Sequence, residues 1–153
     1  MYKFKVAQSG KISAEEAAYN LKEQLSDVDA CLILYFVSTY FPGDEISKAM
    51  AKAFSGIKTV GCTTSGELFE GMMSQNSIVA MAWGKETLKF LKVEVLENIK
   101  TDTKVVDKAF ESFEESLGKS MKDLDPAQYV GIVLIDGMSG CEEQLNDQFG
   151  KSH

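Results

Sequence analysis

The stretch ACLILYFV at residues 30–37 is the feature that most restricts how this chain can fold. A continuous apolar run of this length is typical of a central strand that is covered on both faces of a sheet. The run is far shorter than the roughly 20 apolar residues that a membrane-spanning helix needs. It therefore predicts a buried strand within a layered α/β fold, and no segment that spans a bilayer.

Strand and helix patterns also precede this run. Residues 2–9 alternate like an edge strand, and residues 13–25 then place apolar side chains on one helical face. Ser13 is followed three residues later by Glu16, which is the spacing of a capping box at a helix start. The chain is therefore expected to begin with a strand and a helix.

The alternation of strands and helices continues after the central run. A helix over 44–54 and a strand over 57–62 complete a β-α-β unit. Two alternating segments, 77–84 and 87–98, predict one antiparallel hairpin over 77–98. The remaining predicted elements are a helix over 102–118 that stops at Gly118, a buried strand over 129–137 and a helix over 141–150. The expected fold class is α/β, with helices packed on a mixed sheet.

Composition limits the domain count and the partners. A chain of 153 residues, 44% of them apolar, suits a single domain over residues 1–150, with 151–153 as a disordered tail. The net charge of -7 disfavours nucleic acid and anionic membrane surfaces as partners. The amino terminus lacks the apolar core of a signal peptide, so a cytoplasmic location is expected.

The cysteines do not suggest a disulfide framework or a metal site. Cys31, Cys62 and Cys141 are odd in number, widely spaced and form no CxxC pair. Such cysteines fit reduced thiols better than disulfides or a zinc site. We therefore predict no structural metal and assign no cofactor.

One supersecondary pattern occurs twice. Residues 31–54 and 131–149 both run from an apolar strand through a small-residue loop into an acidic helix start. The second copy reaches residue 153 before a matching closing strand, which suggests a truncated or unusually short member of a longer architecture. An apolar edge or helix face is then expected to stay partly uncovered, which would favour a homodimer.

The densest group of small polar side chains is TVGCTTSGEL at residues 59–68. A turn between Gly61 and Gly66 would let backbone N–H groups and neighbouring hydroxyls surround a carboxylate or carbonyl. Glu67 is close enough in sequence to meet an ammonium group, so the stretch suits a zwitterion. A tight turn without any ligand is an equally open interpretation.

Two further candidates follow buried strands. Ser38 comes after the central run and Asp136 after the predicted strand over 129–137. Strand carboxyl ends are where open α/β sheets gather ligands, so three loops could converge. For Asp136 a turn or helix-cap role stays open. The candidate ligand site consists of Ser38, Gly61, Cys62, Thr63, Thr64, Ser65, Gly66, Glu67 and Asp136.

Catalysis has little support from the residues. A nucleophile such as Cys62 or Ser65 needs a base, and the only histidine is His153 at the last position. Lys58 or Glu67 could substitute, but neither makes a recognised pairing. The loop lacks the Gly-Lys-Ser/Thr ending of a P-loop, which disfavours a nucleoside triphosphate. No catalytic residue is assigned, and Cys62 is interpreted as a small buried hydrophobe.

Other apolar residues near these loops have simpler interpretations. Met72 and Met73, just past the glycine-bounded stretch, are predicted to fill gaps in the core. Tyr40 and Phe41 lie in a loop, where they could shape a pocket or a partner surface. Trp83 lies in an apolar strand pattern and is expected in the core.

Three segments, at 29–38, 57–68 and 132–145, resemble in order and pattern the amino-terminal half of FIST domains, sensory modules of intracellular signal-transduction proteins. The resemblance covers roughly residues 1–150. Its most specific part is a family pattern of a branched residue, Gly, a small residue, a hydroxyl residue, a small residue, Gly and an acid. The residues that match this pattern in order are Val60, Gly61, Cys62, Thr63, Thr64, Gly66 and Glu67, with Ser65 between Thr64 and Gly66.

This resemblance implies a sensory domain that binds a small polar ligand, such as an amino acid, and acts with a downstream signalling protein. Two alternatives of other classes remain open. One is a hydrolase or transferase that uses Cys62 or Ser65, and the other is a protein-interaction domain without a ligand.

Overall fold

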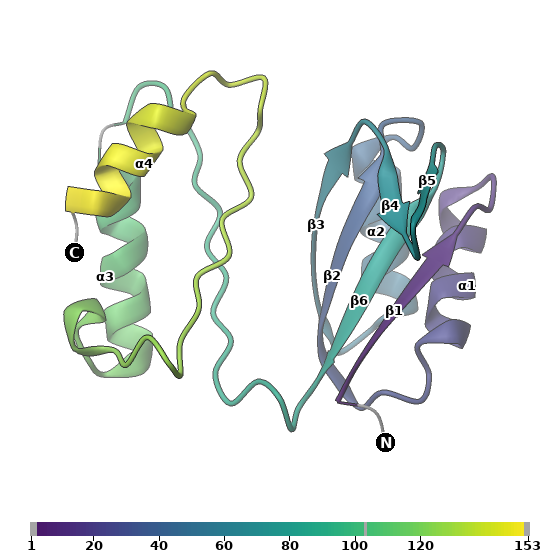
Figure 1. The fold of residues 1–153 in the computed structure, drawn as a ribbon, viewed down its shortest axis with the longest axis horizontal. Coiled ribbons are helices and arrows are strands. Elements are labelled where there is room, and N and C mark those ends of the chain that lie inside the picture. The colour runs from purple at the N-terminus through teal and green to yellow at the C-terminus, as the bar shows by residue number, and fades with distance from the viewer. Residues whose placement is uncertain (1–2, 103, 152–153) are drawn as a thin grey trace. The chain divides into compact units, whose positions relative to one another are not determined.

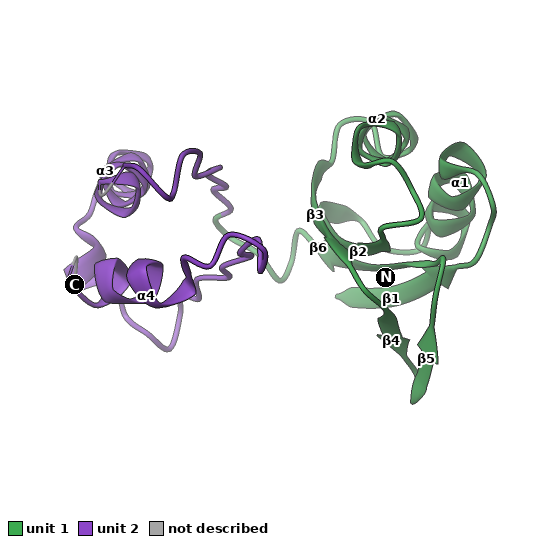
Figure 2. Cartoon of the chain, turned by 90° about the horizontal axis from the view of Figure 1, so that it is seen from above, with its two compact units in different colours: residues 1–90 green, residues 91–153 purple. Residues whose placement is uncertain are grey.

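The computed structural model describes residues 3–102 and 104–151, and the chain divides into two compact units, 1–90 and 91–153 (Figure 2). The single domain expected over residues 1–150 stays a prediction. Of the expected tail over 151–153, Lys151 is the last residue of a helix, and the other two residues lie outside the described ranges.

The described part of the first unit holds two helices and six strands (Figure 1). Four strands form one sheet in the order β1-β6-β2-β3, where β2 and β3 are parallel and β6 is antiparallel to both of its neighbours. Strands β4 and β5 form a separate antiparallel hairpin. The mixed α/β architecture confirms the predicted fold class. The elements are β1 (Phe4–Ser9), α1 (Ala14–Gln24), β2 (Ala30–Ser38), α2 (Gly43–Ala53), β3 (Lys58–Thr64), β4 (Glu67–Phe69), β5 (Met72–Ser74) and β6 (Ile78–Gly84).

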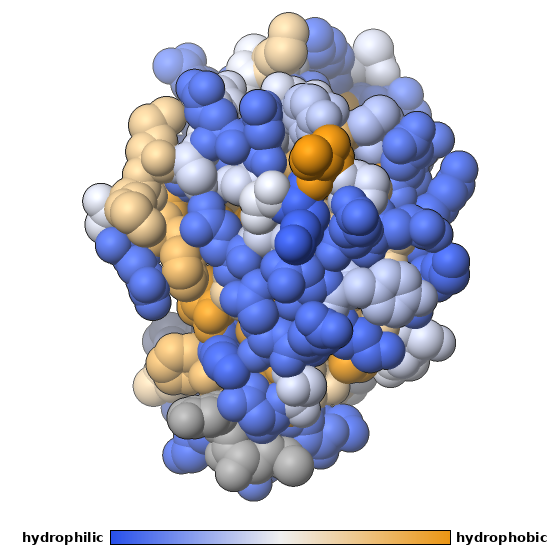
Figure 3. Space-filling model, turned by 90° about the vertical axis from the view of Figure 1, so that its right-hand side faces the viewer, coloured by the Kyte–Doolittle hydropathy of each residue, from blue (hydrophilic) through white to orange (hydrophobic). Residues whose placement is uncertain are grey.

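Strand β2 has a neighbour on each side, as its apolar sequence predicts. Ile33, Tyr35 and Val37 alternate onto the face that α1 and α2 cover, and all three are buried. Figure 2 shows both helices on this face and the β4–β5 hairpin on the other side of the sheet. Viewed from the side of α1, the surface is mostly hydrophilic, with apolar side chains along one edge (Figure 3). The unit therefore has its main core under the helices.

Helix α1 begins at the predicted cap. The Ser13 hydroxyl accepts a hydrogen bond from the Glu16 backbone N–H at 3.3 Å and donates to the Glu16 carboxylate at 3.0 Å. The cap satisfies one of the N–H groups that every helix start leaves without a partner. The two residues of the predicted capping box are therefore in contact.

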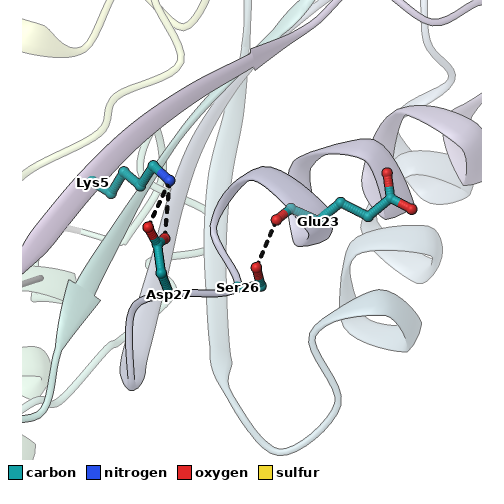
Figure 4. A network of polar contacts seen from close by, with 4 residues as sticks. All are labelled: Lys5, Glu23, Ser26 and Asp27. Carbon is teal, nitrogen blue, oxygen red and sulfur yellow. Dashed lines mark hydrogen bonds and ion pairs between the residues drawn. The ribbon is translucent and has the colours of Figure 1, made fainter. Parts of the chain in front are cut away.

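An ion pair ties the turn after α1 to strand β1. Lys5 Nζ lies 2.9 Å from Asp27 Oδ1 (Figure 4), and this hydrogen bond lowers the pKa of the Asp27 carboxyl. Nearby, the Ser26 hydroxyl donates to the Glu23 carbonyl at 2.8 Å, which satisfies an acceptor at the helix end. These contacts stabilise the connection between α1 and β2.

The second unit is helical in its described part. It contains α3 (Val105–Leu117), the 3-10 helix η1 (Met121–Asp123) and α4 (Glu142–Lys151). Gly118 ends α3 with a φ of 67°, as the sequence predicts. A small core joins α3 to α4, with the Phe110 and Phe149 ring centroids 5.9 Å apart. None of the described helices is both long and apolar enough to cross a membrane.

Two predicted strand regions are corrected by the structure. The predicted hairpin over 77–98 is wrong, because β6 forms but already pairs with β1 on one edge and β2 on the other. No strand forms over 87–98. The predicted buried strand over 129–137 is also wrong, since this segment has no strand partner and its large apolar side chains are exposed. The repeated unit keeps its helix in α4 but not its strand.

Candidate functional site

Polar groups gather at one end of the sheet in the first unit. The parallel strands β2 and β3 end there at Ser38 and Thr64, which are partners in the strand register. The Thr39 N–H donates to the Thr64 carbonyl at 3.3 Å, and the Ser38 N–H donates to the Ser77 carbonyl at 3.0 Å. This is the carboxyl end of the parallel pair, where open α/β sheets bind ligands.

Glu67 is the buried acid at this end of the sheet. It is the first residue of β4, and only 3% of its surface is exposed. The Thr64 hydroxyl donates to Oε1 at 2.7 Å and the Ser77 hydroxyl donates to Oε2 at 2.6 Å. Both distances lie within the usual range of O–H···O hydrogen bonds. Among the described residues, no lysine or arginine pairs with Glu67.

Two more side chains extend these contacts. The hydroxyl oxygens of Ser74 and Ser77 lie 2.8 Å apart, and Gln8 Nε2 donates to the Ser74 hydroxyl. We call Gln8, Thr64, Glu67, Ser74 and Ser77 the Glu67 network. It joins residues from β1, β3, β4 and β5 to the residue that precedes β6. Gln8, Ser74 and Ser77 did not stand out in the sequence.

The glycine-bounded stretch is mostly strand. β3 continues to Thr64, two residues beyond its predicted end, so Ser65 and Gly66 alone connect it to β4. The predicted turn from Gly61 to Gly66 is therefore wrong over its first half. Gly61 has no positive φ. Instead, a Cβ atom there would lie 2.5 Å from Cε2 of Tyr35, so glycine is needed for the close approach of that ring.

The hydroxyls of this stretch are divided between two faces. Thr63 pairs in register with Val37 on the helix-covered face, whereas Thr64 pairs with Ser38 and points into the Glu67 network. Thr63 and Ser65 are exposed, and neither hydroxyl has a hydrogen-bond partner among the described residues. The structure thus brings together Ser38, Thr64 and Glu67, with Ser65 in the adjoining connection, and leaves Thr63 on the other face of β3.

A family model for the FIST N domain matches residues 31–153. The chain belongs to the FIST family. FIST domains are sensory domains of signalling proteins, and a sensory role fits this chain. Comparisons with curated proteins and with solved structures find no match.

Cys62 of this FIST N domain lacks the surroundings of a reactive thiol. It lies in β3 beside Phe36 and is half-buried. Burial raises the pKa of the Cys62 thiol, which lowers the thiolate fraction near neutral pH. Within the described ranges, no group of three or more His, Cys, Asp or Glu residues is placed to hold a metal ion.

Asp136 belongs to the second unit of this FIST N domain, so its convergence with Ser38 and Glu67 stays a prediction. Its carboxylate is exposed and accepts a hydrogen bond from the Met138 N–H at 2.9 Å, as a turn residue does. The Ser38 hydroxyl likewise accepts from the Tyr40 N–H at 3.2 Å. Both side chains already serve the local turn that follows them.

The methionines past the glycine-bounded stretch are not core residues. Met72 and Met73 are 65% and 67% exposed on strand β5, so their predicted role in filling the core is wrong. In the loop after β2, Phe41 is buried at 3% exposure while Tyr40 is half-exposed, with the two rings packed edge to face. Trp83 is partly buried in β6.

Proposed function

We propose that this FIST N domain is a sensory module that binds a small polar molecule with a cationic group at the Glu67 network. An amino acid or a similar metabolite is the ligand class that fits, and binding occurs without turnover. The observation that carries the proposal is a carboxylate with 3% exposure whose hydrogen-bond partners are neutral hydroxyls. Removing a carboxylate from water costs several kcal/mol unless an opposite charge offsets it.

The carboxylate of Glu67 has capacity left for such a ligand. Two carboxylate oxygens offer roughly four acceptor sites, and the hydroxyls of Thr64 and Ser77 take one on each oxygen. An ammonium group would supply both the missing charge and further donors. The Ser65 hydroxyl lies two residues before Glu67 along the chain and has no hydrogen-bond partner among the described residues, so it is available to the polar remainder of the same molecule.

The cellular setting is part of the same proposal. FIST domains are sensory domains of signalling proteins, so we place this one inside the cell with a downstream signalling protein as its partner. The net charge of -7 supports a small ligand or a protein rather than nucleic acid.

A thermal-shift assay with the common amino acids tests the proposal. A compound at about 100 times its dissociation constant should stabilise the fold by roughly 2.7 kcal/mol. At about 2–4 °C per kcal/mol for a domain of this size, the melting temperature should rise by roughly 5–11 °C. Glu67→Gln should lose the shift, because it keeps the side-chain shape and removes the charge.

Two further variants sharpen this assay. Glu70→Gln makes the same chemical change at an exposed residue of the same hairpin and should keep the shift. Ser65→Ala should reduce the shift while its own melting temperature without ligand stays unchanged, because this exposed hydroxyl has no hydrogen-bond partner among the described residues. A panel without any shift, or a Glu67→Gln variant that responds like the wild type, would reject the proposed site.

Thiol labelling tests the alternative of a hydrolase or transferase that uses Cys62. Because burial raises the pKa of this thiol, we expect alkylation near pH 6 to be slow and no faster than at Cys31. The rate at Cys62 should rise only in alkaline solution, as the thiolate forms. Mass spectrometry of the labelled peptides reads each cysteine separately, with Cys62→Ser as the blank. Fast, selective labelling of Cys62 at pH 6 would favour catalysis.

A further inference from the structure

The tip of the β4–β5 hairpin packs weakly on the rest of the first unit. Its two strands are joined by a tight turn at Glu70 and Gly71, with φ values of 48° and 78°. Leu68, Met72 and Met73 are between 65% and 76% exposed, so the hairpin buries few of its apolar side chains. A segment with little apolar burial belongs to the least stable part of a fold.

The base of the hairpin is held by hydrogen bonds between side chains. Glu67, the first residue of β4, bonds to Thr64 of β3 and to Ser77, which follows β5. Ser74, the last residue of β5, bonds to Ser77 and to Gln8 of β1. Both strands of the hairpin are thus attached to the larger sheet through the Glu67 network.

The same contacts close off the Glu67 carboxylate. This carboxylate belongs to the hairpin but points at the sheet, where its partners Thr64 and Ser77 lie, and the residue is 3% exposed. A molecule from solution therefore reaches it only when the hairpin moves away from the sheet. Short connections flank the hairpin at 65–66 and 75–77, where Asn76 has a φ of 56°. Such connections can serve as hinges.

We propose that the β4–β5 hairpin is a lid over the Glu67 carboxylate and that the Glu67 network is its latch. The hairpin turns as one piece about its two connections, and each opening exposes the carboxylate to solvent. The inference rests on the proposed function only for the identity of the molecule that enters the site. The latch itself is a property of the free protein. A ligand panel without a thermal shift would reject the proposed function, whereas unchanged hydrogen exchange in the latch variants would reject the lid.

Hydrogen exchange of the free protein, read by mass spectrometry over residues 66–75, tests the latch. Thr64→Val keeps the side-chain shape but removes the donor to Oε1, and Ser77→Ala removes the donor to Oε2. Each leaves the buried carboxylate less satisfied in the closed state, which favours opening. We expect exchange in this segment to accelerate about tenfold or more in either variant.

Thr59→Val is the matched control. It makes the same substitution in the same strand at a residue whose side-chain hydroxyl has no hydrogen-bond partner among the described residues, so exchange over 66–75 should stay at the wild-type rate. Unchanged exchange in both latch variants would overturn the proposal. Acceleration that extends to β2 and β6 would overturn it as well, because the network would then hold the whole sheet. If Thr64→Val does not fold, Ser77→Ala decides the outcome alone.

Discussion

Replacing Gly61 by valine should lower the free energy of unfolding by about 3 kcal/mol, at the upper end of the range for overpacked sites. A Cβ at this position would lie 2.5 to 2.6 Å from three ring atoms of Tyr35. The ring is buried at 7% exposure, so it has little freedom to move aside. At about 2–4 °C per kcal/mol, the melting temperature should fall by roughly 6–12 °C.

Two controls separate the ring contact from a general effect of losing glycine. Gly10→Val adds the same side chain where a Cβ would meet nothing within 4 Å, and it should change the melting temperature little. Valine is also a strong strand former, so a loss at Gly61 cannot come from strand propensity. Gly61→Val in a Tyr35→Leu background should destabilise much less than in the wild type. Equal losses in both backgrounds would contradict the assigned contact.

Gly61 also illustrates why the role of a glycine is hard to read from sequence. The pattern around it predicted a turn between Gly61 and Gly66, whereas the structure uses the missing side chain to admit a ring from the neighbouring strand. Tyr35 and Gly61 are partners in the register of β2 and β3. A strand-ending turn and a close strand contact look alike until that register is known.

Periodicity predicted local structure well where an element carries its own signal. The helices α1, α2, α3 and α4 all form within a few residues of their expected bounds, and the apolar run at 30–37 became the central strand β2. Strands that depend on distant partners were less predictable. Residues 87–98 alternate as a strand should, but the edges of β6 were already taken by β1 and β2. An alternating pattern shows that a segment can pair as a strand, but it does not show whether another strand has a free edge to pair with.

The residues of the candidate site were likewise predicted in part and missed in part. Glu67 and Thr64 were identified because they lie in an unusual run of small polar residues after a strand. Gln8, Ser74 and Ser77 were missed because each is a single common polar residue, and Gln8 lies 66 residues from Ser74 in the chain. The only available signal was position, since Gln8 is near the end of a strand pattern and Ser77 begins an apolar run. Tertiary structure alone showed that they share one network.

The protein should self-associate into a homodimer at high protein concentration. In the second unit, Val130, Ile132 and Val133 are 83%, 56% and 50% exposed, within an apolar segment over 129–135. This exposure agrees with the expectation of uncovered apolar surface. No backbone hydrogen bond joins residues 130–135 to another described residue, so their N–H and C=O groups are available to an extended partner strand.

We expect the partner to be a second copy of this chain, because no charge repulsion opposes pairing between the two copies of this segment. The chain carries a net charge of -7, but residues 129–135 contain no acidic or basic side chain. Val130→Lys/Ile132→Lys should therefore convert the dimer to a monomer in light scattering, since facing lysines would repel each other. Ser55→Lys/Asn146→Lys adds the same charge at exposed residues elsewhere and should leave the dimer intact. A wild-type protein that stays monomeric at every concentration, or a dimer that survives the lysines at 130 and 132, would exclude this segment as the contact.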